Sequence, residues 1–172
     1  MALTAGVTVR QLGAQDVEDF RRIRLSALAT APEAFGSTLD RETTRPLEMF
    51  AERLSASIVF GAYRDGRIVG MIGLKREDGP KMSHKAFIWG FFVEPECRGL
   101  GLGTALIEAA LAAAREIVEQ VALTVVEGNA EAARLYERFG FQRYGTEPRA
   151  LKSADGYVDE ALMVLLFAPR AA

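Results

Sequence analysis

The most informative segment of the sequence is Arg98-Gly99-Leu100-Gly101-Leu102-Gly103-Thr104, which lies between an apolar segment and an alanine-rich one. Before it, residues 86–93 read Ala-Phe-Ile-Trp-Gly-Phe-Phe-Val, an aromatic and β-branched run that is typical of a buried strand. After it, apolar residues recur at intervals of three and four from Leu102 to Ile117, which is typical of a helix with one apolar face. The sequence therefore predicts a glycine-rich turn between a buried strand and a helix.

Glycines at such a turn have a specific consequence for the start of the following helix. They permit backbone conformations closed to other residues, and they leave no side chain between the main chain and a ligand. The first N–H groups of a helix have no partner within the helix, and they lie at its positive dipole end. Phosphate groups bind such positions readily. We therefore predict that this turn is a cradle for a diphosphate group.

Two common diphosphate motifs do not fit the spacing. A Rossmann fingerprint needs Gly-x-Gly-x-x-Gly, whereas Gly99, Gly101 and Gly103 alternate and the third glycine comes one residue early. That fold also needs an acidic residue at the end of a following strand, and Glu119 instead falls at the end of the predicted helix. A P-loop needs a Lys-Ser/Thr pair after the glycines, and none follows. A glycine-rich turn without a ligand remains the alternative.

The turn does match a third pattern, Arg/Gln-x-x-Gly-x-Gly/Ala, through Arg98, Gly101 and Gly103. Val93 and Pro95 precede it at the usual spacing. The segment resembles the acetyl-CoA pyrophosphate loop of the GNAT superfamily of N-acetyltransferases.

A second segment about thirty residues later carries the same resemblance. An apolar run over residues 121–126 is followed by the pattern Asn129-x-x-Ala132-x-x-Leu135-Tyr136 and then Gly140-Phe141. This pattern predicts a strand, a short turn, a helix capped by Asn129 and a stop at Gly140. In GNAT enzymes the same pattern follows the fifth strand, and its tyrosine lies beside the CoA sulfur.

The remainder of the chain predicts further elements. In chain order they are a strand at 7–12, a helix at 17–28, a polar loop at 32–46, a helix at 47–54, strands at 57–63 and 67–74, a charged loop at 75–83, the strand at 86–93, the helix at 102–117, the strand at 121–126, the helix between 129 and 140, and strands at 141–152 and 157–167. The dipeptides Asp65-Gly66 and Asp155-Gly156 predict the turns of two hairpins. This order resembles that of the GNAT fold.

The resemblance implies the α/β fold class: one mixed twisted sheet of about seven strands flanked by about four helices, in a single domain over residues 1–172. With 172 residues, 49% of them hydrophobic, the chain can form a substantial core. The chain has 21 basic and 23 acidic residues, and the basic ones are not gathered into a stripe along the sequence. We therefore expect no nucleic-acid partner. No apolar run is long enough to cross a membrane, and no signal peptide is visible. We therefore expect a soluble, cytoplasmic protein without a membrane partner; a homodimer is left open.

The resemblance also implies a set of residues for acetyl-CoA. Backbone groups at the end of the fourth strand would contact the thioester carbonyl and the pantetheine arm. The glycine-rich loop would bind the pyrophosphate, the asparagine would contact pantetheine, and the tyrosine would protonate the departing sulfur. These residues are Phe91, Phe92, Val93, Arg98, Gly99, Leu100, Gly101, Leu102, Gly103, Thr104, Asn129 and Tyr136.

The general base is left open by the sequence. Family members that acetylate ribosomal-protein N-termini carry a glutamate on the fifth strand, where this chain has Thr124. Glu94, at the end of the fourth strand, is our choice because it lies closest in sequence to the thioester-binding strand end. Glu127 and His84, the single histidine, are alternatives, as is a chain of water molecules.

We expect an N-acetyltransferase that uses acetyl-CoA as co-substrate and needs no metal, because the chain has one cysteine, one histidine and no cluster of ligands. Its acceptor would be a primary amine: a small amine, an amino acid, an antibiotic or a peptide N-terminus. Segments 32–54 and 147–159, where acceptor specificity would lie, carry no known motif. The carboxylates of Glu94, Glu127, Asp159 and Glu160 would favour a cationic amine if several of them line the cleft. A non-catalytic acyl-CoA-binding regulatory module and a nucleotide-diphosphate-binding protein are the alternative classes.

Overall fold

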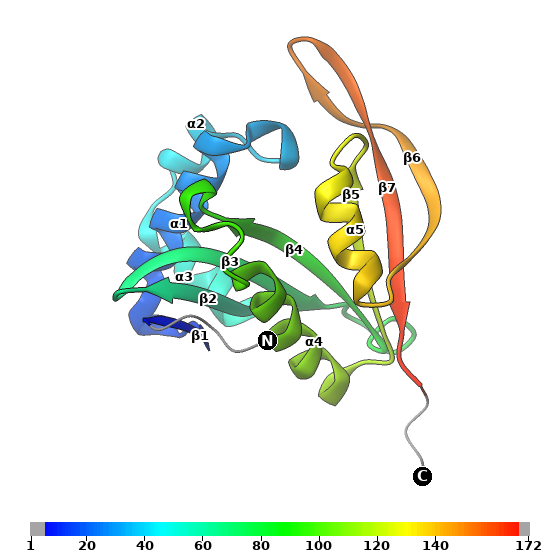
Figure 1. Ribbon diagram of the computed structural model, residues 1–172, viewed down its shortest axis with the longest axis horizontal. Coiled ribbons are helices and arrows are strands. Elements are labelled where there is room, and N and C mark those ends of the chain that lie inside the picture. Colours follow the sequence, from blue (N-terminus) through cyan, green and yellow to red (C-terminus); the bar gives the residue numbers. More distant parts are fainter. Residues whose placement is uncertain (1–5, 169–172) are drawn as a thin grey trace.

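The computed structural model describes residues 6–168. Its centre is a seven-stranded sheet with the strand order β1-β2-β3-β4-β5-β7-β6 (Figure 1). Neighbouring strands are antiparallel except for β4 and β5, which are parallel. The strands are β1 (Val7–Gln11), β2 (Ile58–Arg64), β3 (Arg67–Arg76), β4 (Lys85–Val93), β5 (Gln120–Val126), β6 (Gln142–Ser153) and β7 (Gly156–Leu166). The mixed seven-stranded sheet expected from the sequence is confirmed.

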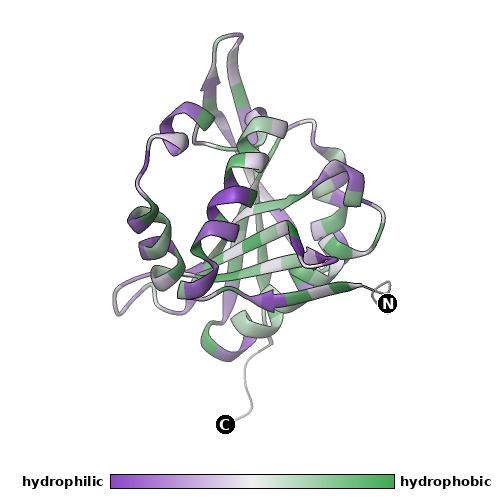
Figure 2. Cartoon of the chain, turned by 90° about the vertical axis from the view of Figure 1, so that its left-hand side faces the viewer, coloured by the Kyte–Doolittle hydropathy of each residue, from purple (hydrophilic) through white to green (hydrophobic). Residues whose placement is uncertain are grey.

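Helices cover both faces of this sheet. They are α1 (Val17–Thr30), α2 (Leu39–Thr43), α3 (Leu47–Ala56), α4 (Leu102–Ile117) and α5 (Ala130–Arg138). One cluster of buried residues lies beneath α4 and α5, and a second lies beneath α1 and α3. Successive residues of β4 alternate between the two, since Phe91 packs with the first cluster and Phe92 with the second. The strands behind the helices are largely hydrophobic, while the helices are banded with hydrophilic residues (Figure 2).

One helix was absent from the sequence prediction. The helix α2 lies within residues 32–46, which we predicted to be a loop, so the described chain has five α-helices where about four were expected. Its five residues are too few to show an apolar periodicity. The Thr38 side chain accepts a hydrogen bond from the Arg41 N–H group and caps the helix. Glu42 is only 1% exposed and is held by Arg53, so tertiary ion pairs stabilise this turn.

The parallel strands β4 and β5 separate after a short paired stretch. Residues 85–87 pair with residues 120–122, and no pairing continues beyond them. On its other side β4 carries a bulge, because Met71 pairs with Phe92 while Gly73 pairs with Trp89. Gly90 lies in the bulge with a φ of +65°, a conformation that favours glycine. The second half of β4 therefore presents backbone groups to the gap between the two strands (Figure 1).

Candidate active site

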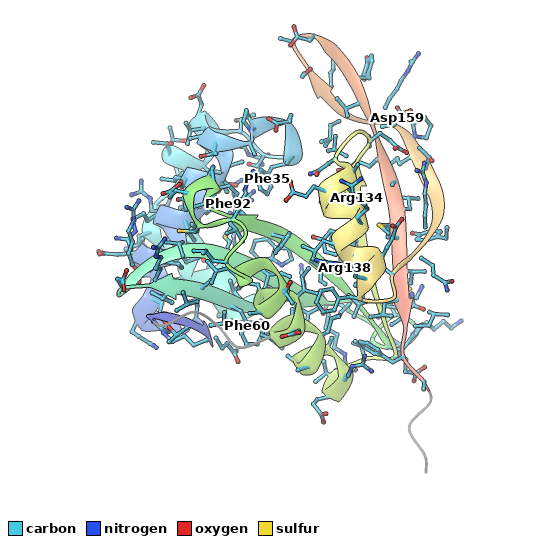
Figure 3. The ribbon with its side chains drawn as sticks, in the orientation of Figure 1. Phe35, Phe60, Phe92, Arg134, Arg138 and Asp159 are labelled. Carbon is cyan, nitrogen blue, oxygen red and sulfur yellow. The ribbon has the colours of Figure 1, made fainter. Side chains whose placement is uncertain are left out.

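A cleft of about 630 Å³ opens in the gap between β4 and β5. Residues 87–93 of β4 form its floor with residues 124–126 of β5. The turn before α4 and the helix α5 supply one wall, and the end of α1 with the segment up to Gly36 supplies another. Phe35 and Arg138 both line the cleft, and Figure 3 shows them on opposite sides of the gap. Ligand sites in α/β sheets commonly lie at such points, beyond the carboxyl ends of parallel strands.

The glycine-rich turn faces this cleft. Gly99 and Gly101 have left-handed φ values of +77° and +81°, and Gly101 is the N-cap residue that immediately precedes α4. A Cβ atom at Gly99 would meet nothing within 4 Å, so the main chain there is open to a ligand. The Nε of Arg98 donates a hydrogen bond of 3.2 Å to the carbonyl of Val93, which ties the turn to the end of β4. The first turn of α4 therefore directs free N–H groups toward the cleft.

Gly103 has a role that sequence reasoning missed. A Cβ atom there would lie 3.2 Å from Cζ of Phe91 and 3.6 Å from Cδ2 of Leu135. The absence of a side chain thus lets Phe91 pack against the first turn of α4. The Phe91 ring lies 5.8 Å from the ring of Tyr136. Gly103 therefore supports the packing beside the tyrosine as well as keeping the turn open.

Tyr136 is the buried residue of α5, with 5% of its surface exposed. Its ring lies between those of Phe91 and Phe141, the latter at 5.6 Å and edge-on. Tyr136 lines the cleft, and its hydroxyl makes no hydrogen bond to any other residue between positions 6 and 168. Burial raises the pKa of this phenol above its ordinary value of 10.0. The side chain is therefore a protonated donor at the edge of the cleft.

Asn129 and Thr124 also line the cleft. The Asn129 Oδ1 accepts a hydrogen bond of 3.2 Å from the Ala132 N–H group, so the predicted cap of α5 is confirmed. Its amide NH₂ remains available as a donor. Thr124 places a hydroxyl, rather than a carboxylate, on the cleft side of β5.

Two predicted residues do not line the cleft. Leu100 packs against the hydrophobic core instead. Glu94 is 7% exposed, and its Oε1 accepts a hydrogen bond of 2.6 Å from the Ser26 hydroxyl on α1. The other predicted contacts with the co-substrate all line the cleft: Phe91, Phe92, Val93, Arg98, Gly99, Gly101, Leu102, Gly103, Thr104, Asn129 and Tyr136.

The alternative bases also lie outside the cleft lining. Glu127 forms an ion pair with Arg143. His84 precedes β4 at the end where that strand pairs with β5, and its carbonyl accepts hydrogen bonds from Glu119 and Gln120. Neither side chain reaches the open half of the gap.

Charged side chains in the cleft differ from those expected. Four carboxylates were expected to favour a cationic amine, and of these only Glu160 lines the cleft. Glu94, Glu127 and Asp159 do not line it, and Asp159 accepts a hydrogen bond from the Arg149 N–H group. Sequence reasoning missed three further charged lining residues: Arg24, Glu131 and Arg138. Arg24 is hidden in sequence because it lies within an amphipathic helix and outside any motif.

Residues 6–168 contain neither a candidate metal site nor a candidate membrane-spanning helix. No three or more His, Cys, Asp or Glu side chains are grouped there so as to hold a metal ion. Among the helices of the same residues, none is long and apolar enough to cross a membrane.

Comparisons with known proteins agree with this geometry. Residues 20–141 match the family model described as acetyltransferase (GNAT) family. The mycothiol acetyltransferase of Geodermatophilus obscurus is 31% identical over 153 residues, which cover 86% of this chain and 48% of that protein. The spermine/spermidine N(1)-acetyltransferase of Bacillus subtilis is 34% identical over 90 residues, 49% of this chain and 59% of that protein. The chain thus spans about half the length of the mycothiol acetyltransferases that it matches.

Solved structures share the fold over nearly the full chain. A GNAT acetyltransferase from Streptococcus pneumoniae superposes with a TM-score of 0.83 at 22% identity, covering 94% of this chain and 99% of that one. A putative acetyltransferase from Salmonella typhimurium, solved with its cofactor acetyl-CoA, has a TM-score of 0.79 at 19% identity and covers 97% of each chain. From the matched family model and the common fold it follows that this chain belongs to the acetyltransferase (GNAT) family.

Proposed function

We propose that the protein is an acetyl-CoA-dependent N-acetyltransferase that moves an acetyl group directly from the thioester to a primary amine. The observation that carries this proposal is the Tyr136 hydroxyl, a buried donor without a hydrogen-bond partner among the described residues, in a cleft beside a helix N-terminus. A protein that only binds acyl-CoA has no need of a proton donor at that position.

The chain offers suitable groups for each part of acetyl-CoA. N–H groups of residues 98–104 would bind the pyrophosphate at the N-terminus of α4. The separated part of β4, residues 91–93, would supply backbone groups to the thioester carbonyl and the pantetheine arm. The NH₂ of Asn129 would donate to pantetheine. Acetyl-CoA would supply the activated acetyl group.

The reaction needs one bond to form and one to break. The amine nitrogen of the acceptor attacks the thioester carbonyl carbon, and the carbon–sulfur bond breaks. N–H donors on the bulged part of β4 would stabilise the negative charge that develops on the carbonyl oxygen. Tyr136 would give its proton to the departing sulfur, and the amine would lose one proton to a base. The proton count then balances, with an amide and a thiol as products.

The base has two candidates among carboxylates. Glu94 stays the sequence-based choice, and its contact with Ser26 would have to open for it to accept a proton from the cleft. Glu160 is a second candidate, because it lines the cleft and its side chain forms no hydrogen bond or ion pair with another residue between positions 6 and 168. Water within the cleft remains a third route.

The proposal is tested by release of free CoA thiol from acetyl-CoA in the presence of small amines, amino acids, aminoglycoside antibiotics and peptides with free N-termini. The expected result is thiol release that depends on one of these classes, with an N-acetyl product detected by mass spectrometry. Binding of acetyl-CoA without turnover on any class would instead favour the regulatory module. Tighter binding of ATP or NAD than of acetyl-CoA would favour a nucleotide-binding protein.

A further inference from the structure

Arg24 is a buried cation in the wall of the cleft. It extends from α1, lines the cleft and has only 8% of its surface exposed. Its guanidinium makes no hydrogen bond to any other residue in the described part of the chain, and its Nε is fully buried without a partner. Burying guanidinium N–H groups without hydrogen-bond partners costs free energy, and native proteins rarely bury such groups unless a ligand or a function requires it.

The charge of Arg24 is also poorly neutralised. The nearest carboxylate is Glu42, at 3.9 Å from Nη2. Glu42 is already held by Arg53, through two hydrogen bonds of 2.8 and 3.1 Å, and lies 3.4 Å from Arg45. Three arginines therefore share one carboxylate, which leaves excess positive charge behind the cleft. Burial lowers the pKa of Arg24, and the nearby Glu42 only partly opposes this.

The guanidinium of Arg24 lies in the part of the cleft where the acceptor amine would bind, away from the glycine-rich turn. Its central carbon lies 5.1 Å from the centre of the Phe35 ring, and its Nη1 lies 4.0 Å from the Cβ position of Gly90. Gly90 immediately precedes the strand end at which we place the thioester. The helix α1 packs with the opposite hydrophobic cluster from α4, so the cation lies across the sheet from the glycine-rich turn. An anion that meets Arg24 therefore comes from the acceptor rather than from the pyrophosphate.

We propose that the acceptor is an amine that carries a carboxylate next to its amino group, as a free α-amino acid does, and that Arg24 binds this carboxylate. The inference rests on the proposed acetyl transfer and names its substrate class. A guanidinium forms paired hydrogen bonds with a carboxylate, and the apolar surroundings strengthen them. A carboxylate beside Gly90 would hold the neighbouring amine close to the thioester. A polyamine, by contrast, would bring its own positive charge against Arg24.

The first experiment compares matched acceptors with the unmodified protein. Thiol release from acetyl-CoA is measured with each of the twenty L-amino acids, with their α-amides, and with spermidine. The amides have lower amine pKa values and more neutral amine at pH 7.5, so intrinsic reactivity favours them. We expect at least one free amino acid to exceed its amide in kcat/KM by more than 10-fold. Equal or faster acetylation of the amides or of spermidine would overturn the inference and leave acetyl transfer itself established.

The second experiment replaces the arginine. Arg24→Gln should raise KM for the preferred amino acid about 10²-fold, because a charge-assisted pair of hydrogen bonds is lost, while KM for acetyl-CoA changes less than twofold. Arg24→Lys should recover part of the loss through its charge. Arg21→Gln is the matched control: it lies on the same helix, has a buried and unpaired Nε, but does not line the cleft. A rise in the acetyl-CoA KM of Arg24→Gln would mean that Arg24 serves the co-substrate, against the inference.

A binding measurement covers the case in which no acceptor reacts, which would contradict the proposed acetyl transfer. The melting temperature is measured with CoA plus N-acetyl amino acids or their amides. If the N-acetyl acids, and not the amides, stabilise the parent but not Arg24→Gln, the carboxylate site stands without the transfer. If neither group stabilises the parent, the carboxylate site is refuted as well.

Discussion

Tyr136 owes its chemistry to two separate features of its surroundings. Its place on the inner side of α5 buries the ring between Phe91 and Phe141, and this burial raises the pKa of the phenol. Its hydroxyl nevertheless reaches the cleft without a partner among the described residues. Such a group keeps its proton through the neutral range and can transfer it to the sulfur as the carbon–sulfur bond breaks.

Replacing Tyr136 by phenylalanine should therefore lower kcat by about 10²-fold or more, since a general acid contributes 10²–10⁴-fold. Binding of acetyl-CoA should stay nearly unchanged, because the ring packing survives. In the parent, the raised pKa predicts no loss of rate from phenol ionisation below about pH 10. Steady-state rates and acetyl-CoA titration measure both effects. An unchanged kcat, with chemistry shown to be rate-limiting, would assign the proton to water or another group.

The base can be identified by a matched set of glutamine variants. If Glu160 accepts the amine proton, Glu160→Gln should lower kcat/KM about 10²-fold and flatten its rise between pH 6 and 9. Glu94→Gln should have the same effect if the sequence-based choice is right. His84→Gln serves as the control, since His84 lies outside the cleft lining. If kcat/KM of every variant rises with pH according to the amine pKa of the acceptor, the enzyme binds the neutral amine and needs no carboxylate as a base.

Sequence motifs identified some of these residues and not others, for a physical reason. Tyr136 and Asn129 belong to a local pattern whose spacing fixes both the helix cap and the cleft-facing side. Arg24 becomes a cleft residue only because α1 packs beside the bulge of β4, which is a tertiary event. Glu94 was chosen by proximity along the chain, but the end of β4 directs its side chain to Ser26. Nearness in sequence did not predict side-chain direction there.

At the scale of elements, the turn before α4 depends on backbone conformation. Gly101 is the N-cap of the helix and has a φ of +81°, where a side chain is strained. Gly101→Asp should weaken acetyl-CoA binding at least 10²-fold, because a carboxylate would occupy the phosphate position at the helix N-terminus. Calorimetric titration measures the affinity. Gly66→Asp is the control, since Gly66 has a φ of +79° but lies in the β2–β3 hairpin, outside the cleft lining. Equal affinities for the two variants would refute the cradle.

An ion pair between Arg10 and Asp16 joins β1 to the residue that precedes α1. Asp16 is buried and accepts hydrogen bonds of 2.8 and 2.7 Å from Arg10 and one of 2.9 Å from the Gly13 N–H group. The bond from Arg10 chiefly lowers the pKa of Asp16 below its ordinary value of 3.8. A lowered pKa in the folded state means that the ionised carboxylate stabilises the fold above about pH 4, and that this contribution disappears as the pH falls further.

Asp16→Asn should accordingly lower the free energy of unfolding by about 1–3 kcal/mol at pH 7. The difference from the parent should shrink as the pH falls toward 3. Urea denaturation at both pH values measures it, with Asp155→Asn in the exposed β6–β7 turn as the control. A difference that is constant between pH 7 and pH 3 would show that the charge of Asp16 contributes nothing.

The order of elements was predictable because the long helices and strands have clear apolar periods. Helix α4 follows the spacing of Leu102 to Ile117, and the β2–β3 turn falls at Asp65-Gly66 as predicted. The β6–β7 turn is Ala154-Asp155, one residue earlier than the predicted Asp155-Gly156, because Gly156 already pairs with Ser153. Helix α2 was missed because its five residues gain their stability from buried Glu42 and its arginines. The separation of β4 from β5 was likewise hidden, since both strands remain apolar beyond the point where their pairing ends.

For the molecule as a whole, this separation creates two sheet halves with a narrow junction. Strands β1–β4 form one half and β5–β7 the other, and only residues 85–87 and 120–122 pair across the boundary. The cleft occupies the open part of that boundary and is lined from both halves. A ligand that fills it adds contacts between the halves where backbone hydrogen bonds are missing.

Acetyl-CoA should therefore stabilise the whole fold. At 100 times its dissociation constant it adds about 2.7 kcal/mol, which corresponds to roughly 5–10 °C in melting temperature for a chain of this size. Adenosine should add much less, because it lacks the diphosphate and the pantetheine arm. Differential scanning fluorimetry measures both shifts, and Gly101→Asp should lose the one caused by acetyl-CoA. Hydrogen exchange should slow in β4, β5 and α5 together, because the bound co-substrate spans them. Protection confined to one half of the sheet would mean that the ligand does not bridge the cleft.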